Sequence, residues 1–476
     1  MIKTAQSASF ILLLFFLFSG FCTRAQVSHT LYWMHGIPQS QYLNAGVQPH
    51  PNIYIGVPAL SSLQMGIGHS SFAMQDILKR RDTGMLYFDD QGLLSSLSDR
   101  NNLSGEYHHE LLGFGFRTQK NYFSFSLTER AAADFTYPAD LFRLLIHGND
   151  YFLQQSIERG EDVAADLSDI NMTFLHYREW ALGYSRQWTP ELSAGARAKI
   201  VQGLGNVSVD RFDMSLLTHP DNYELLLSSN LLINTNIPFQ LAPLDSLDSE
   251  TSFTLSDEEI FNYFVTHRNM GFALDIGGIY EINDEFTVSL GVNDIGFVNW
   301  TSHPENFAMQ GEFAFEGIEF NDFFDNDNEN QFDQIRDSIT ELFDITETAN
   351  TYRTMLPAKI FIAGAYDITS EHKAGLLAGG YFYSGTFRPS LTLSYNFSPT
   401  PHFGSTMSYT IIHGNYRNLG LGFYSNLGPV QIYAAADNII APLRPHTLRT
   451  ATLQLGINIV LGYKKKVIEE EPSIRL

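Results

Sequence analysis

The sequence predicts an all-β protein: a transmembrane antiparallel β-barrel of about fourteen strands, within a range of roughly 12–16. Three observations predict this class. Apolar and polar residues alternate in segment after segment, the links between these segments are alternately short and long, and aromatic residues gather at one end of them. Successive side chains of a strand point to opposite faces, so each segment has one apolar and one polar face. In a membrane barrel the apolar face meets lipid and the polar face lines the lumen.

The N-terminus has the order of an export signal. Lys3 provides a positive charge, residues 9–18 (SFILLLFFLF) form a short apolar run, and cleavage is expected between Ala25 and Gln26. The run is about ten residues long, which is too short for a membrane-spanning helix. Cys22 is the single cysteine of the 476 residues. We therefore expect a mature chain without any cysteine.

Composition excludes several classes of protein. The chain has 29 basic and 52 acidic residues, a formal net charge of -23, whereas a nucleic-acid binder needs clustered basic residues. Residues 245–347 contain 24 acidic residues and only two basic ones. Within them, residues 322–333 (DFFDNDNENQFD) lack the glycine and the closing glutamate of a calcium loop, so we interpret them as a solvated acidic loop. Apolar residues at helical spacing predict an amphipathic helix at 331–343.

The expected strands follow in chain order, and the links between them decide between two architectures. Links after even-numbered strands are all short, whereas links after odd-numbered strands include every long one. Outer-membrane barrels have short periplasmic turns and long outer loops, while a soluble β-sandwich has no reason to place its long loops at one end. Residues 223–233 and 307–315 also alternate, and we assign them to hairpins above the membrane because counting them as spanning strands breaks the rhythm. The fourteen strands are expected at 62–72, 105–117, 121–134, 170–188, 191–203, 269–281, 285–297, 355–367, 372–384, 387–398, 402–412, 418–426, 429–440 and 449–463.

Aromatic residues support the orientation. Trp, Tyr and Phe are favoured at lipid-facing positions near a membrane interface. Arg186 also points outward on this register, beside Trp188, where its head can reach the interface. Six of the seven strands that descend to the periplasmic side end with an outward aromatic residue: Phe116, Trp188, Tyr280, Tyr366, Phe397 and Tyr463.

The predicted lumen face carries charged residues, which are the candidate site residues. Opposite charges inside a barrel either pair across a closed lumen or line a polar path, and we favour pairing. No catalytic, cofactor-binding or metal site is predicted, because alternation sends His108 and His109 to opposite faces and no phosphate loop, HExxH pattern or nucleophile elbow occurs. We therefore expect no enzyme activity and no cofactor. The candidate lumen-facing charges are Arg197, Lys199, Asp275, Lys359 and Asp437.

Several short segments resemble an uncharacterised group of outer-membrane barrels related to the long-chain fatty-acid transporter (FadL-type) superfamily. Where members of that superfamily carry an Asn-Pro-Ala box, this chain has Asn44-Ala45-Gly46. The resemblance implies passage of hydrophobic molecules, an N-terminal plug in the lumen and a lateral opening in the wall. Some related barrels, such as the one in the type IX secretion machinery, instead serve exported proteins. The segments are SQYLNAGVQP at 40–49, YIGVPALSSLQMGIGHSSF at 54–72, VNDIGFVNW at 292–300, LPAKIFIAGAY at 356–366 and ADNIIAP at 436–442.

These observations define the expected organisation. A signal peptide at 1–25 is followed by a plug segment at 26–60, an outer-membrane barrel at 61–463 and a periplasmic tail at 464–476. The expected function is passive transport of hydrophobic small molecules across the outer membrane of a Gram-negative bacterium. The alternative is a non-transporting barrel that acts as a scaffold or partner in protein secretion or surface assembly. Expected partners are outer-membrane lipid and either hydrophobic small molecules or secreted proteins, but no nucleic acid.

Overall fold

A computed structural model gives the fold of most of the chain. The expected signal peptide, the acidic run at 322–333, the helix at 331–343 and the C-terminal tail lie outside the described residues. No helix in the described part of the chain combines the length and the apolar character needed to cross a bilayer. The described residues are 29–82, 84–237, 269–316, 345–412, 415–440, 446 and 449–463.

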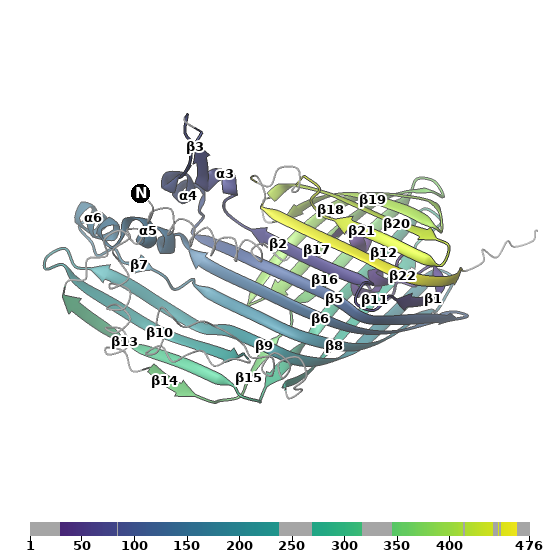
Figure 1. The fold of residues 1–476 in the computed structure, drawn as a ribbon, viewed down its shortest axis with the longest axis horizontal. Coiled ribbons are helices and arrows are strands. Elements are labelled where there is room, and N and C mark those ends of the chain that lie inside the picture. The colour runs from purple at the N-terminus through teal and green to yellow at the C-terminus, as the bar shows by residue number, and fades with distance from the viewer. Residues whose placement is uncertain are drawn as a thin grey trace, which may run out of the picture.

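Fourteen strand positions close into one antiparallel barrel (Figure 1), which confirms the predicted class and strand number. Each strand pairs with its neighbour along the barrel, and the first position pairs with the last. That first position is shared by β1 (Pro51–Gly56) and β2 (Ser62–His69). The others are β5 (Arg100–Thr118), β6 (Asn121–Pro138), β8 (Asn171–Gln187), β9 (Leu192–Thr218), β11 (Asn269–Glu281), β12 (Phe286–Trp300), β16 (Ala358–Asp367), β17 (His372–Tyr383), β18 (Thr386–Thr400), β19 (Phe403–Ile412), β20 (Asn415–Leu427), β21 (Val430–Ala436) and β22 (Thr450–Tyr463).

The first strand of the barrel is interrupted. Both β1 and β2 lie between β22 and β5, so together they fill one position in the wall. The wall therefore begins at Pro51, before the expected start at residue 61. Pro58 has no backbone N–H, and Ala59 has a φ of 58°, so the strand breaks at residues 57–61 and the alternation is lost there. The break stays bonded to the wall, because the Ala59 N–H donates to the Leu111 carbonyl over 3.0 Å.

Alternation along β18 and β22 separates an apolar exterior from a polar face toward the lumen. On β18, Leu391 and Leu393 are exposed, whereas Thr392 and Ser394 are buried inside the barrel. On β22, outward Leu453, Leu455, Ile457, Ile459 and Leu461 are all exposed, and Thr452, Gln454 and Asn458 between them are buried. The period of two read from the sequence is thus the period of the barrel wall.

The predicted rim of aromatic residues is present at the end with the short turns. Phe116, Trp188, Tyr280 and Tyr366 are exposed. The guanidinium carbon of Arg186 lies 5.1 Å from the centroid of the Trp188 ring, which places this cation beside an interfacial aromatic. Phe397 is only partly exposed, and the side chain of Tyr463 lies outside the described set.

Beyond the barrel, β9 continues into an extension of the same sheet. Its 27 residues exceed the roughly ten that a tilted strand needs to cross a membrane. The extra length pairs with β10 (Glu224–Asn236), which pairs with β13 (Glu305–Glu316), which pairs with β14 (Ile345–Thr348). The segments expected as outer hairpins at 223–233 and 307–315 therefore lie outside the fourteen strand positions, but they pair with each other in one extension. β7 (Ala165–Asp166) pairs with the same part of β9, and β15 (Tyr352–Met355) pairs with β12.

Short helices occupy the N-terminus and the outer links. Helices α3 to α6 lie together at one end of the barrel (Figure 1). Phe152 of α6 packs on Leu216 and Leu225, which ties the helices to the β9 extension. The remaining elements are α2 (His29–Tyr32), η1 (Pro38–Tyr42), α3 (Met74–Ile77), β3 (Leu78–Arg80), β4 (Leu86–Phe88), α4 (Asp90–Ser96), α5 (Ala139–His147) and α6 (Asp150–Arg159).

Candidate functional site

The N-terminal segment, residues 29–50, lies against lumen-facing side chains of the barrel. The Thr30 hydroxyl donates to the Asp437 carboxylate over 2.5 Å, and the Thr30 N–H donates to the same oxygen over 2.9 Å. The amide of Gln39 donates to the Asn458 side-chain oxygen over 3.0 Å, and the amide of Asn458 returns a bond of the same length. Asp437, one of the predicted lumen charges, is therefore bonded to the N-terminal segment.

Glycines in the N-terminal segment and in the barrel wall let the two pack closely. A Cβ added to Gly36 would lie 2.1 Å from the ring of Tyr424, and one added to Gly375 in β17 would lie 2.3 Å from the ring of Trp33. Both distances are far below van der Waals contact. The seat of the segment therefore depends on glycines in the segment and in the wall.

One titratable group in this segment has a strongly shifted pKa. Burial, together with the positive charges of Lys373 and His50, lowers the pKa of His35 to about 3. Burial disfavours the charged imidazolium, so His35 is neutral at neutral pH.

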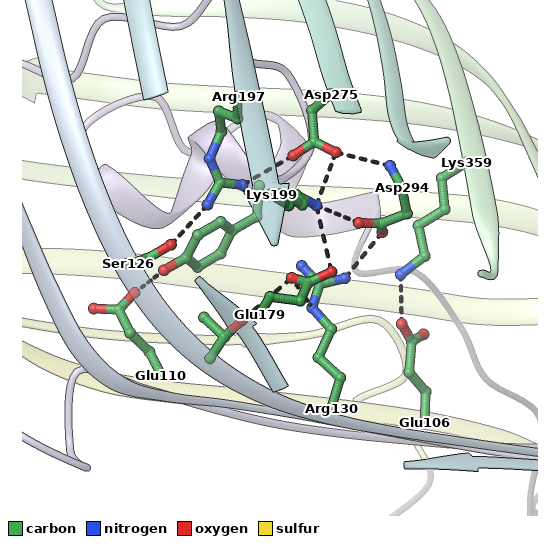
Figure 2. Close-up of polar contacts among 12 residues, drawn as sticks. Glu106, Glu110, Ser126, Arg130, Glu179, Arg197, Lys199, Asp275, Asp294 and Lys359 are labelled. Carbon is green, nitrogen blue, oxygen red and sulfur yellow. Dashed lines mark hydrogen bonds and ion pairs between the residues drawn. The ribbon is translucent and has the colours of Figure 1, made fainter. Parts of the chain in front are cut away.

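A set of six charged residues lies inside the barrel (Figure 2), and we call it the lumen ion network. It contains three cations and three carboxylates from five strands, so it is neutral as a set. All six side chains are buried. The members are Arg130 of β6, Glu179 of β8, Arg197 and Lys199 of β9, Asp275 of β11 and Asp294 of β12.

Each cation of the network has a carboxylate within hydrogen-bond distance. Arg197 Nη1 lies 3.1 Å from Asp275 Oδ2, and Lys199 Nζ lies 2.8 Å from Asp275 Oδ1. Lys199 also contacts Asp294. Arg130 Nη1 donates to Asp294 over 2.9 Å, and Arg130 Nε lies 3.0 Å from Glu179 Oε2. Paired in this way, opposite charges from five strands hold the wall together across the lumen.

Asp294 reaches the lumen through an irregularity of the strand. The register of β11 and β12 shifts between Leu274 and Ile276, and Asp294 has a φ of 61°. Asn293 and Asp294 are consequently both buried, although strict alternation sends the second to lipid. The Asp294 N–H donates to Asp275 over 2.8 Å, which fixes the two carboxylates side by side.

Other ion pairs link strands that lie across the lumen from each other. Lys359 of β16 contacts Glu106 of β5, so this predicted lumen charge is paired outside the main network (Figure 2). Near the outer end, Arg388 of β18 lies 2.6 Å from Asp134 of β6. The walls are therefore joined at more than one height.

Tyr42 connects the N-terminal segment to the network. Its hydroxyl donates to Glu110 of β5, which also accepts the hydroxyl of Tyr54 in β1. The guanidinium carbon of Arg197 lies 4.6 Å from the Tyr42 ring centroid, and the His108 ring lies 4.9 Å from it. A cation over this ring face is favourable, so a shift of the segment would disturb both Glu110 and the network.

A hairpin closes over the lumen from the outer side. Ser384, in the turn between β17 and β18, donates to the Asn171 side chain over 2.7 Å and bonds Thr173 over 3.0 Å. Both partners belong to β8, which lies five positions away around the barrel. This turn therefore crosses the lumen and contacts another part of the wall.

Sequence reasoning placed Arg197, Lys199 and Asp275 in the lumen but missed the other three members of the network. Alternation along the strand identifies both Arg130 and Glu179 as inward. Arg130 shares the face of inward Ser126, and Glu179 lies on the face opposite to outward Trp188. No such signal exists for Asp294, because the bulge reverses its face.

The geometry defines the class: a closed, fourteen-stranded antiparallel barrel of the outer-membrane type. The chain belongs to a family of unknown function (DUF5723), whose model matches residues 46–437. An uncharacterised family of barrels is what the resemblance implied. No curated protein matches the chain significantly.

Several solved structures are similar to the chain. The Ralstonia pickettii toluene transporter TbuX is 9% identical over 88% of this chain and 91% of its own, with a TM-score of 0.37. The Pseudomonas putida toluene transporter TodX is 9% identical over 92% and 94%, with a TM-score of 0.33. A Pseudomonas aeruginosa FadL homologue is 8% identical over 92% and 100%, with a TM-score of 0.37. At these scores the likeness carries no argument about what this barrel does.

Replacing Lys199 with Met should destabilise the barrel by about 3–5 kcal/mol, because three buried carboxylates are left with two cations. The free energy of unfolding in denaturant, followed by the heat-modifiable gel shift, measures this. Lys373→Met is the control, since it removes a surface pair with Asp367 at 3.2 Å whose side chains are 38% and 30% exposed. That change should cost about 1 kcal/mol or less. Equal losses in the two variants would contradict the role of the network.

The packing of the N-terminal segment should weaken as the pH falls. A pKa of about 3 in the packed state lies below the ordinary value near 6.5, so the stabilisation is complete above about pH 6.5 and is lost progressively toward pH 3. Hydrogen exchange of peptides from residues 29–50 should be faster at pH 5 than at pH 7, after correction for intrinsic rates. A His35→Gln variant should lose this difference, and a wild-type chain without it would contradict the prediction.

Proposed function

We propose that this chain is exported with cleavage of residues 1–25, inserts into the outer membrane of a Gram-negative bacterium, and forms a passive path for hydrophobic small molecules. The observation that supports transport is the apolar content of the lumen. A single buried cluster extends from Trp33 and Ile37 in the N-terminal segment to Val298 and Trp300 in the wall. A barrel that conducts only water and ions has a polar interior, so a continuous apolar zone fits an apolar solute better.

The apolar cluster runs beside the lumen ion network. Leu175, Val201 and Leu356 belong to it and are buried, as are the charged groups. Side chains therefore fill the route in this conformation. Passage requires the N-terminal segment to move, and we propose that residues 29–50 act as a plug that seals the barrel until it is displaced.

The alternative is a non-transporting barrel that serves as a scaffold or partner in protein secretion or surface assembly. Closure of the lumen at several heights favours it: the N-terminal segment, the lumen ion network and the turn at Ser384 each cross the interior. A scaffold needs a rigid wall and a shaped outer surface, and it needs no route through the lumen.

Uptake into liposomes separates the two functions. The wild-type chain should admit a hydrophobic fluorescent probe faster than empty vesicles, and a variant without residues 26–49 should admit it several-fold faster. The deletion ends before β1, because Pro51 already belongs to the wall. Tyr223→Ala, at an exposed position outside the barrel, is the control and should match the wild type. Absence of uptake in both the wild type and the deletion variant would rule out transport and favour the scaffold.

The location is tested separately. When the full-length gene product is expressed, the mature protein should fractionate with outer membranes and begin at Gln26. It should also migrate faster on a gel when it is not boiled, as folded barrels do. Edman sequencing or mass spectrometry gives the new N-terminus. Recovery in the soluble periplasmic fraction, with no heat-dependent mobility, would contradict the proposed location.

A further inference from the structure

The tip of the β17–β18 hairpin stands apart from the strands on either side of it. On the β16 side, pairing of β17 ends at Phe382, which is opposite Ala358. On the β19 side, pairing of β18 begins at Ser390. In the described part of the chain, residues 383–389 therefore have no neighbouring strand beyond their own hairpin. We call residues 383–389 the outer tip.

The outer tip leans across the lumen to the opposite wall. Its Arg388 pairs with Asp134 of β6 over 2.6 Å. From β6, the chain of paired strands reaches β18 in seven steps, through β8, β9, β11, β12, β16 and β17, which is half of the fourteen positions. The Ser384 hydroxyl bonds two side chains at the outer end of β8. Strands on opposite sides of a barrel do not touch through the wall, so these contacts require the tip to bend inward.

The base of the outer tip has the composition of a hinge. Gly379 and Gly380 of β17 are opposite Ser390 and Pro389 of β18. A Cβ added to Gly380 would lie 2.4 Å from the ring of Phe387, so this position needs glycine. Pro389 has no N–H to donate to a neighbouring strand. Glycine and proline weaken strand pairing, and hinges are short segments that absorb changes in φ and ψ. The tip can therefore swing from this base while the wall below keeps its pairing.

The two faces of the outer tip have different surroundings. Phe387 is exposed on the outer face, whereas Tyr383 and Arg388 are buried on the inner face. The buried Tyr383 hydroxyl has no hydrogen-bond partner among the described residues. A buried hydroxyl without a partner costs free energy, and an outward swing would return it to water. The inward position is thus held by a few side-chain contacts and opposed by one unsatisfied group.

We propose that the outer tip is a gate at the outer end of the lumen, closed in this structure. Two latches hold it: the bonds of Ser384 to β8 and the ion pair of Arg388 with Asp134 of β6. The N-terminal segment meets β18 below the tip, where His29 bonds Ser390 over 2.7 Å. Neither latch contains a residue of that segment, so the gate is distinct from the proposed plug. The gate controls access to the lumen, whether or not a solute passes through the barrel.

Labelling of a single cysteine from outside tests the gate in the full-length protein. The expected mature chain has no cysteine, so one introduced thiol reports alone. Thr136 shares the inward face of β6 with Asp134, is opposite Asn171 and is buried. In whole cells, Thr136→Cys should react slowly with a membrane-impermeant maleimide. Adding Ser384→Ala or Arg388→Gln should speed this reaction several-fold, because each change removes one latch.

A matched control separates opening of the gate from general loosening. The Ser95 hydroxyl bonds the Gly92 carbonyl within α4, so Ser95→Ala removes a local bond of an outer link. This variant should label at the rate of the Thr136→Cys parent. Equal rates in the parent and both latch variants would overturn the gate, and so would an equal rise in the control. Heat-modifiable mobility shows which variants are folded, and Ser384→Ala, which removes a single oxygen, decides the test if Arg388→Gln does not fold.

A disulfide across one latch tests the gate in the opposite direction. The hydroxyl oxygens of Ser384 and Thr173 lie 3.0 Å apart, so cysteines at these two positions are close enough to be oxidised by copper phenanthroline. In the variant without residues 26–49, this disulfide should lower uptake of the hydrophobic probe several-fold, and a reductant should restore it. Undiminished uptake with the disulfide formed would overturn the gate. If no variant admits the probe, the proposed transport fails, and the labelling rates of Thr136→Cys still decide whether the tip opens.

Discussion

Closure of the sheet is the constraint on which the other features depend. A bilayer core offers no water to backbone N–H and C=O groups, so every strand of a membrane barrel needs two bonded neighbours. In this chain the last strand, β22, meets the first position, and that position is filled by two short strands with a break between them. The break remains bonded, since the N–H groups of Ala59 and Ile457 both donate across it. Without these bonds the barrel would have an open edge at this point.

Closure also dictates what the lumen contains. Once one face of each strand is given to lipid, most polar residues of the wall point inward into a restricted space. Buried charges there are tolerated only with partners, which explains why the network matches three cations with three carboxylates. Glu110, buried beside the break in the first strand, follows the same rule: it accepts two tyrosine hydroxyls, one of them from the N-terminal segment. Through Glu110, the position of the N-terminal segment is therefore connected to the closure of the wall.

The sequence predicted the parts of this structure that depend on local pattern. Strand number, order and orientation follow from alternation and turn length, and the inward positions of Arg197, Lys199 and Asp275 follow from parity. Contacts across the lumen, such as Lys359 with Glu106, depend on the curvature of the barrel, which a short stretch of sequence does not specify. The sequence predicted two separate hairpins where the structure has one extension of β9, because the strands of this extension are separated by long links in the chain. The start of the wall at Pro51 was hidden by the break at residues 57–61.

Two features depart from the pattern of polar residues inside and apolar residues outside. Asp294 turns inward through a bulge and finds Arg130 and Lys199 in the same chain, so its departure is compensated within the barrel. Glu129 and Arg178 keep strict alternation and thereby bring charges to a face where the pattern elsewhere is apolar. They pair with each other over 2.9 Å, and their side chains are only 14% and 15% exposed, so this pair too is compensated within the wall. Closure of the sheet therefore brings charges to both faces of the wall, and the same rule applies on each face: Asp294 inside and Glu129 outside both lie against a cation of the same chain.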